Sequence, residues 1–178
     1  MISGHVFIAT SLDGFIARKN GDIGWLLERD DPSEDHGYDA FIKDIDMIVM
    51  GRGSYECMRD VRPWPYTRPV LVLFSSLKDE QIPEELASKV RFSDKSPEVT
   101  MAMLDAQGIR RVYVDGGRVI QSFLRAGLIA DMVITRVPVL LGQGRRLFGT
   151  LAADIPLVHE NTCAFGSGLV QSRYRIAA

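Results

Sequence analysis

Two stretches of the chain place glycines between a strand-like run and a helix-like run, and such junctions can bind phosphate. In one of them, the apolar residues 112–114 lead through Asp115 into Gly116 and Gly117, where an amphipathic helix begins. Glycines let a ligand approach the backbone, and the unpaired N–H groups of a first helical turn attract anions. This junction therefore suits a nucleotide phosphate. Arg118, a cation in the same turn, opposes the helix dipole and is either solvated or close to an anion, and we favour the anion.

A second junction has the same order of elements. Residues 47–50 form a strand-like run, Gly51-Arg52-Gly53-Ser54 follows, and a short helix is expected through Met58. A further strand over residues 70–74 ends at Ser75-Ser76, small hydroxyls at a strand end of the kind where open α/β sheets bind ligands. Each feature also has a simpler explanation. The segment Gly51-Arg52-Gly53-Ser54 could be a tight turn with Ser54 as the N-cap, and Ser75-Ser76 could be an ordinary loop. The full G-x-G-x-x-G fingerprint and the P-loop are missing, so neither glycine junction is specific alone.

The elements that must position these residues follow from the pattern of apolar runs. Apolar runs alternate with helical patterns, which predicts an α/β fold with a mostly parallel sheet and helices on both faces. Strands are expected near residues 4–9, 47–50, 70–74, 90–92, 112–114, 132–137, 157–163 and 169–176. The last two flank Gly166-Ser167-Gly168, which predicts an antiparallel hairpin.

Two helices have ends that the sequence defines. Asp31 as N-cap, Pro32 at the first position and Glu34 in a capping box predict that one begins near residue 32. Its expected buried stripe is apolar and comprises Tyr38, Phe41, Ile42 and Ile45. Ser96-Pro97 predicts the start of the other helix and Gly108 its end. The residues expected to face the core from this second helix are Val99, Ala102, Met103 and Ala106.

Length and composition bound the kind of protein. A chain of 178 residues, 46% hydrophobic and 25% charged, fits a single domain over residues 1–178. The net charge of −2 and the scattered basic residues favour no nucleic-acid partner. Two cysteines, a start without a basic leader and the absence of a long apolar run predict a cytoplasmic protein with no membrane partner. Three dispersed histidines without ligand spacing predict no metal site.

Several segments, in order, resemble one superfamily. They are SLDGFIA from Ser11, GDIGW ending at Trp25, VMGRGSYE from Val49, VDGG from Val114 and PVLLGQGRRLF from Pro138. Together they resemble the dihydrofolate-reductase-like superfamily, and with the closing SGLVQSRYR they look most like its riboflavin-biosynthesis reductase branch and the small stand-alone relatives. The resemblance implies a three-layer fold, a mixed and mostly parallel sheet with an antiparallel last strand, and an NADPH-dependent reductase.

The resemblance also implies which residues bind NADPH. Ala9 and Ile16 would offer backbone groups to the nicotinamide carboxamide. The segment Gly51, Arg52, Gly53 and Ser54 would contact the cofactor phosphates. Ser75 and Ser76 would lie beside the adenosine ribose and its 2′-phosphate. The segment Gly116, Gly117, Arg118, Val119 and Ile120 would bind the pyrophosphate.

For the substrate, the resemblance points to acidic residues near the nicotinamide. Asp13 and Asp35 are the expected catalytic carboxylates, and Trp25 and Asp39 are expected near the substrate. Asp13 has an alternative role in opening a β-turn with Gly14, and Asp35 has one in stabilising a helix dipole. Asp35 is the preferred acid over Asp39, which points further toward solvent.

The predicted reaction is hydride transfer from NADPH to a small pterin-like or ribosylaminopyrimidine-like heterocycle. Arg145 and Arg146 either bind an anionic substrate or brace the sheet or a subunit contact, and we favour bracing. A homodimer is expected because small relatives pair. The signature of the zinc deaminases is absent from this chain. Two alternatives from other classes are an NADP(H)-binding regulatory module without turnover and a structural interaction domain.

Overall fold

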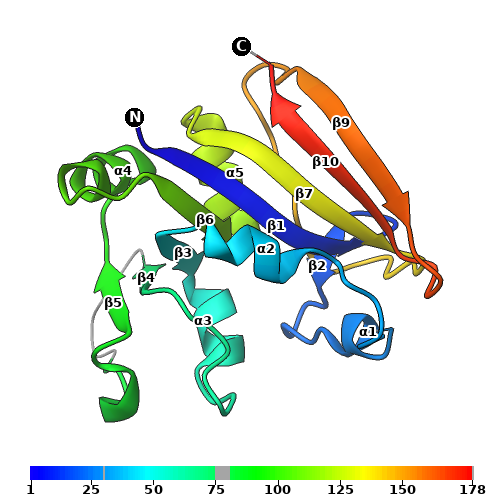
Figure 1. Cartoon of the computed structure of the whole chain (residues 1–178), viewed down its shortest axis with the longest axis horizontal. Helices are drawn as coiled ribbons and strands as arrows, with labels where there is room; N and C mark the ends of the chain where they lie inside the picture. The colour runs from blue at the N-terminus through cyan, green and yellow to red at the C-terminus, as the bar shows by residue number, and fades with distance from the viewer. Residues whose placement is uncertain (30, 75–80, 178) are drawn as a thin grey trace.

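A computed structural model describes residues 1–29, 31–74 and 81–177 of the chain. The central sheet has eight strands in the order β5-β4-β3-β6-β1-β7-β10-β9. The strands are β1 (Ser3–Ser11), β3 (Met47–Gly51), β4 (Val70–Leu73), β5 (Val90–Ser93), β6 (Arg111–Asp115), β7 (Ile129–Val137), β9 (Leu157–Ala164) and β10 (Val170–Ile176). From β5 to β7 neighbouring strands are parallel, whereas β10 is antiparallel to both β7 and β9 (Figure 1). The predicted mixed sheet and its closing hairpin are confirmed.

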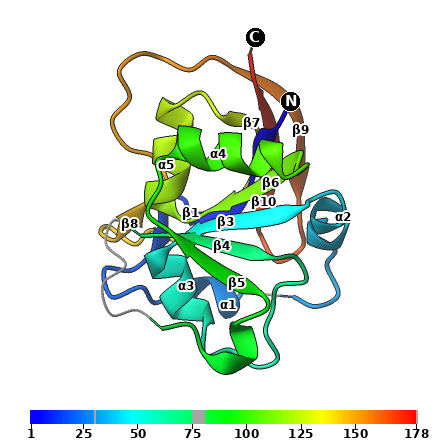
Figure 2. The same cartoon turned by 90° about the vertical axis from the view of Figure 1, so that its left-hand side faces the viewer.

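Helices cover both faces of the sheet, which confirms the three-layer α/β fold. The helices are α1 (Gly24–Leu27), α2 (Tyr38–Lys43), α3 (Arg52–Met58), α4 (Pro97–Ala106) and α5 (Gly117–Arg125), with a 3₁₀ turn η1 (Glu84–Leu86). Figure 2 shows α4 and α5 on one side of the sheet and α2 on the other. Strands covered on both faces bury every side chain, which explains why β3 and β6 read as continuous apolar runs.

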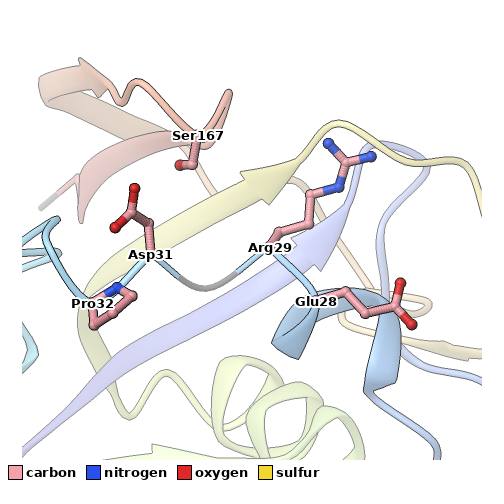
Figure 3. A pocket seen from close by; sticks show the side chains of 5 residues that line it. All are labelled: Glu28, Arg29, Asp31, Pro32 and Ser167. Carbon is pink, nitrogen blue, oxygen red and sulfur yellow. The ribbon is translucent and has the colours of Figure 1, made fainter.

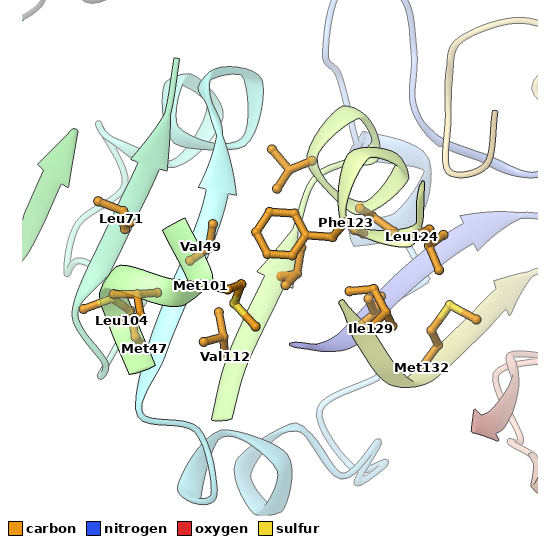
Figure 4. Packing of buried hydrophobic residues seen from close by; sticks show 14 of the residues in the cluster. Met47, Val49, Leu71, Met101, Leu104, Val112, Phe123, Leu124, Ile129 and Met132 are labelled. Atoms are coloured by element: carbon orange, nitrogen blue, oxygen red, sulfur yellow. The ribbon is translucent and has the colours of Figure 1, made fainter. Parts of the chain in front are cut away.

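One hydrophobic core lies between the sheet and the helices α4 and α5. Figure 4 shows Phe123 of α5 pointing onto the strands, with Met101 of α4 near it and Leu104 of α4 beside Met47. Phe123 is fully buried, and burial of such a side chain contributes about 1.5–3 kcal/mol to folding. A second core, which includes Phe41 and Tyr55, fills the opposite face. The two cores fix the strands whose ends carry the glycine junctions.

The ends of α5 follow the sequence pattern. Gly127 adopts φ +66°, and its N–H donates to Leu124 O at 3.1 Å. The N–H of Leu128 donates to Phe123 O at 2.9 Å. These two bonds form a glycine C-cap, which satisfies carbonyls that the helix leaves unpaired. The helix α5 therefore ends just before Gly127.

The start predicted for the helix near residue 32 is wrong. Asp31 Oδ1 accepts hydrogen bonds from Ser33 N at 2.9 Å and Ser33 Oγ at 2.7 Å, which forms a turn instead of a helix. The carboxylate of Glu34 does not close a capping box, because it accepts hydrogen bonds from Ser167 N and Oγ, at 2.8 and 2.5 Å, in the β9–β10 turn. The helix α2 begins only at Tyr38, after Gly37 at φ +80°.

The inward face predicted for α4 is also wrong, although its caps are confirmed. Ser96 Oγ accepts from Val99 N at 3.3 Å, and Gly108 follows the last turn at φ +85°. Val99 and Met103 are 47% and 48% exposed, and Ala102 and Ala106 are exposed as well. The buried residues are Thr100, Met101 and Leu104. The apolar pattern did not predict this face, because one of its three residues, Thr100, is polar.

A small ribbon outside the main sheet covers the glycine junctions. The strands β2 (Phe15–Ala17) and β8 (Arg145–Arg146) pair antiparallel, and Leu147 N donates to Gly14 O at 3.1 Å. An added side-chain carbon at Gly117 would lie 3.2 Å from Ile16 Cδ1. The ribbon therefore lies directly against the start of α5.

Candidate active site

The two glycine junctions predicted from the sequence lie at one edge of the sheet. The strands β3 and β6 pair in parallel up to their last residues, so α3 and α5 begin side by side. A side-chain carbon at Gly116 would lie 2.7 Å from Ser54 Oγ, and one at Gly51 would lie 3.0 Å from Val119 Cγ2. Gly116 also adopts φ +91°, which strains any other residue. Close packing and backbone geometry therefore both require glycine at this edge.

The strand β1 parts from β6 at the same edge. It pairs with β6 over its first residues but with β7 over nearly its whole length. Ser3 N donates to Arg110 O, which shows that odd-numbered residues of β1 direct their backbone groups toward β6. Phe7 O accepts a hydrogen bond from Tyr113 OH at 2.9 Å. Ala9 comes next on this edge, so its N–H and C=O face the gap between β1 and the β6–α5 junction.

Asp115 lies at this edge, and the sequence analysis did not include it among the site residues. Its side chain is half-buried, and burial raises the pKa of its carboxyl above the ordinary value. Hydrogen bonds from Ser54 and Gly116 act in the opposite direction, because they favour the ionised form. The oxygen of Tyr113 lies 3.4 Å from Asp115 Oδ1. Because the single proton of Tyr113 is donated to Phe7 O, its oxygen can accept one from a protonated Asp115. The overlooked signal was a carboxylate directly before paired glycines at the end of a buried strand.

Aromatic side chains surround the Asp115 carboxyl. The Tyr38 ring lies edge-on to Phe7 and Tyr113, with centroids 5.5 and 6.4 Å apart. Burial, with the nearby Asp115 carboxyl, raises the pKa of Tyr38 to about 12 and also raises the pKa of Tyr66. These phenols stay protonated at neutral pH and can donate hydrogen bonds beside apolar rings. Such a wall suits a planar, polar heterocycle.

The Asp13 carboxylate holds two loops together. Asp13 Oδ1 accepts from Ser11 Oγ at 2.6 Å and from Leu141 N at 3.1 Å, and Oδ2 accepts from Gly142 N at 2.7 Å. The bond from Ser11 and the two backbone bonds lower the pKa of Asp13 from 3.8 to about 2. The carboxylate is therefore ionised at neutral pH and does not carry a proton that it could donate.

Asp35 and Asp39 are both exposed. Asp35 lies before α2 and not in a first helical turn, which corrects its predicted placement. Its Oδ1 accepts from Gly37 N at 2.7 Å, so the carboxylate stabilises the turn that leads into the helix. Asp39 is the acid that lies in the first turn of α2. The change follows from the late start of this helix.

Trp25 is 4% exposed and packs with Val137 and Leu169, beside Ala9. Within the described ranges its indole N–H is buried without a hydrogen-bond partner. A buried donor without a partner costs free energy, on the order of 1–3 kcal/mol, unless a ligand or water satisfies it. The predicted tryptophan thus lies next to the Ala9 strand with a free donor.

The remaining predicted cofactor residues differ in whether their side chains are exposed or buried. Arg52 Nε donates to Glu56 Oε1 at 2.6 Å, and its guanidinium lies 5.5 Å from the Phe74 ring centroid. Arg118 is exposed, whereas Val119 and Ile120 are buried. These two side chains belong to the core, so only their backbone can meet a ligand. Ser75 and Ser76 lie outside the described residues.

A wide hollow lies elsewhere on the described surface. It measures about 600 Å³, and its lining residues are Glu28, Arg29, Asp31, Pro32 and Ser167. Figure 3 shows Asp31 and Ser167 facing each other across it. None of its lining residues is a predicted site residue, and its wide, mostly charged surface lacks the apolar wall of a heterocycle site. We therefore assign the candidate active site to the edge around Asp115.

The fold and this strand-end site define a dihydrofolate-reductase-like α/β protein. The structure is similar to dihydrofolate reductase from Enterococcus faecalis, with a TM-score of 0.63 at 19% identity over 99% of this chain and 97% of that one. Residues 4–171 match the RibD C-terminal domain family, and the chain belongs to this family.

Two nearer similarities cover whole chains. The Bacillus subtilis protein YwjB is 31% identical over 171 residues, 95% of each chain. A candidate riboflavin biosynthesis protein from Shewanella sp. PV-4 has a TM-score of 0.91 and 37% identity, over 99% of this chain and all of that one. Among the described residues, no helix is long and apolar enough to cross a membrane.

Proposed function

We propose that this protein is an NADPH-dependent reductase that acts on a small pterin-like or ribosylaminopyrimidine-like heterocycle. The observation that carries the proposal is the shared edge at which β1, β3 and β6 end around a protonatable carboxyl. Membership of the RibD C-terminal domain family supports a reductase of this class. The ligand-binding position also agrees with the general rule that open α/β sheets bind ligands at the carboxyl ends of their strands.

The residues at this edge fit NADPH. Ala9 offers backbone groups along an edge of β1 that has parted from β6. A side-chain carbon at Gly117 would lie 2.5 Å from Arg146 O, so only glycine lets β8 pack this close to the start of α5. The cofactor would be held by Ala9, Ile16, Gly51, Arg52, Gly53, Ser54 and the segment 116–120, and the proposal keeps Ser75 and Ser76 for the ribose phosphate.

The reduction needs a hydride and a proton. Bound NADPH supplies the hydride. Burial raises the pKa of Asp115, which favours the protonated carboxyl, and in this proposal the carboxyl donates its proton to the electronegative atom of the reduced double bond. Water then returns a proton to Asp115. The phenols of Tyr38 and Tyr66 orient the heterocycle by hydrogen bonds.

The other acids have positioning roles in this proposal. Asp13 holds the turn that carries Ile16, and its pKa of about 2 excludes it as the proton donor at neutral pH. Asp35, with Asp39 nearby, orients the substrate at the open side of the site. Trp25 offers its unpartnered indole N–H to the substrate or to a bound water. We also propose a cytoplasmic homodimer, and the two free, exposed cysteines fit a reducing compartment.

Two measurements test the proposal. At 100 times its dissociation constant, NADPH should raise the melting temperature by about 5 °C or more. The absorbance of NADPH at 340 nm should then fall when dihydropterins or phosphoribosylaminopyrimidines are added. An NADP(H)-binding regulatory module would show the first effect and no consumption with any of these substrates. Absence of thermal stabilisation at millimolar NADPH would contradict both functions.

A further inference from the structure

Arg145 is a cation without a role in the proposed reaction. Its backbone belongs to β8, which pairs with β2 and lies outside the main sheet. A side-chain carbon at Gly53 would lie 2.7 Å from Arg145 Nη1, and one at Gly21 would lie 3.4 Å from Arg145 Nη2. The guanidinium therefore lies between the first turn of α3 and the loop before α1, directly over the glycine of the Gly51-Arg52-Gly53-Ser54 segment.

Among the described residues, no carboxylate forms an ion pair with Arg145. Among the ion pairs and hydrogen bonds found in the described ranges, none involves its side chain, which is exposed. A guanidinium held close to backbone with no carboxylate is suited to an anion, because it presents N–H donors in a fixed planar fork.

The neighbouring Arg146 has a different environment, although the two residues are adjacent in sequence. The Arg146 guanidinium lies 4.7 Å from the Phe15 ring centroid, and its carbonyl accepts from Gln121 Nε2 at 3.2 Å. Arg146 thus braces the ribbon against α5, as its predicted bracing role requires. Alternation along β8 sends the two side chains to opposite faces of the ribbon, so only Arg145 lies over Gly53.

We infer that Arg145 is a positioning residue whose guanidinium binds the pyrophosphate of NADPH. This inference rests on the proposed function, since it assumes that NADPH binds at the edge between α3 and α5. The pyrophosphate is the expected anion because Gly53, which lies beneath Arg145, belongs to the β3–α3 junction, and this junction lies beside the β6–α5 junction. A side chain at Gly53 would displace the Arg145 guanidinium, which occupies that space.

The test is calorimetric titration of the full chain with NADPH and, separately, with NADH. Arg145→Gln should weaken both cofactors by about tenfold or more, since both carry the pyrophosphate. Its affinity should also fall less steeply with salt than that of the wild type, because one phosphate contact is missing. Arg146→Gln is the matched control and should change either affinity by no more than about threefold. The melting temperature of each variant without ligand reports whether it is folded.

Two outcomes would overturn the inference while leaving the proposed function intact. One is unchanged binding of NADPH to a folded Arg145→Gln variant. The other is weaker binding of NADPH with unchanged binding of NADH, which would assign Arg145 to the 2′-phosphate. Failure of the wild-type protein to bind either cofactor would instead contradict the proposed function itself.

Discussion

The β6–α5 junction and the β1–β2 turn each place an aspartate directly before a glycine, yet the two carboxyl groups have opposite properties. Asp115 is shielded by aromatic rings, and burial raises its pKa. Asp13 accepts hydrogen bonds from Ser11, Leu141 and Gly142, which lower its pKa to about 2. The comparison teaches that proton chemistry depends on the surroundings of a carboxyl group, because the local sequence is similar in both places.

The largest expected effect comes from removing the proton of Asp115. Asp115→Asn should lower kcat by about 100-fold or more, since general acid catalysis commonly contributes that much. NADPH affinity should stay within a few fold, because the change preserves the size of the side chain. Steady-state kinetics on the substrate found by the consumption assay measures the effect. Asp13→Asn is the matched control, and an equal loss of kcat in both variants would contradict the distinction between the two acids.

The second effect concerns stability. Asp13→Ala leaves the N–H groups of Leu141 and Gly142 without their carboxylate, so the turn over the site loosens. The melting temperature should fall by roughly 3–6 °C. Asp115→Asn should not lower it at pH 7, because it removes a buried acid. Scanning calorimetry of both variants checks this, and a larger loss in Asp115→Asn would reverse the comparison.

The pH dependence of folding stability should distinguish Asp13 from Asp115 without any measurement of activity. The depressed pKa of Asp13 means that its contribution to stability is present above about pH 4 and is lost as the pH falls toward 2. The pKa of Asp115 is shifted in the opposite direction. Its contribution to folding stability is therefore lost as the pH rises through that pKa. Asp115→Asn should therefore gain stability relative to the wild type at alkaline pH. Urea unfolding from pH 2 to 9 measures both trends, and parallel curves for all variants would disagree with them.

The smallest effect is expected for substitution of Asp35, which is exposed. Asp35→Asn should raise KM for the heterocycle by about threefold to tenfold with little change in kcat, as loss of ground-state positioning predicts. Asp39→Asn is the neighbouring control and should have the weaker effect. A loss of kcat at Asp35 comparable to that at Asp115 would mean that the proton role belongs to Asp35.

The sequence predicted the fold well because periodicity and glycine signals are local. The strands, the helix end at Gly108 and the closing hairpin follow from residues close together in the chain. The helix start at Asp31 failed because Glu34 binds Ser167, which is distant in sequence. The glycine junctions were predictable for the same reason as the strands. The importance of Asp115 was not predictable, because burial raises its pKa and only the folded chain buries this carboxyl.

The central claim is that one edge, formed by the ends of β1, β3 and β6, binds the dinucleotide. Amide hydrogen exchange of the wild-type protein with and without saturating NADPH tests it most directly. We predict protection in residues 9–16, 51–54 and 116–120, with little change in β9. Protection confined to other segments, or none in any of these three, would contradict the account.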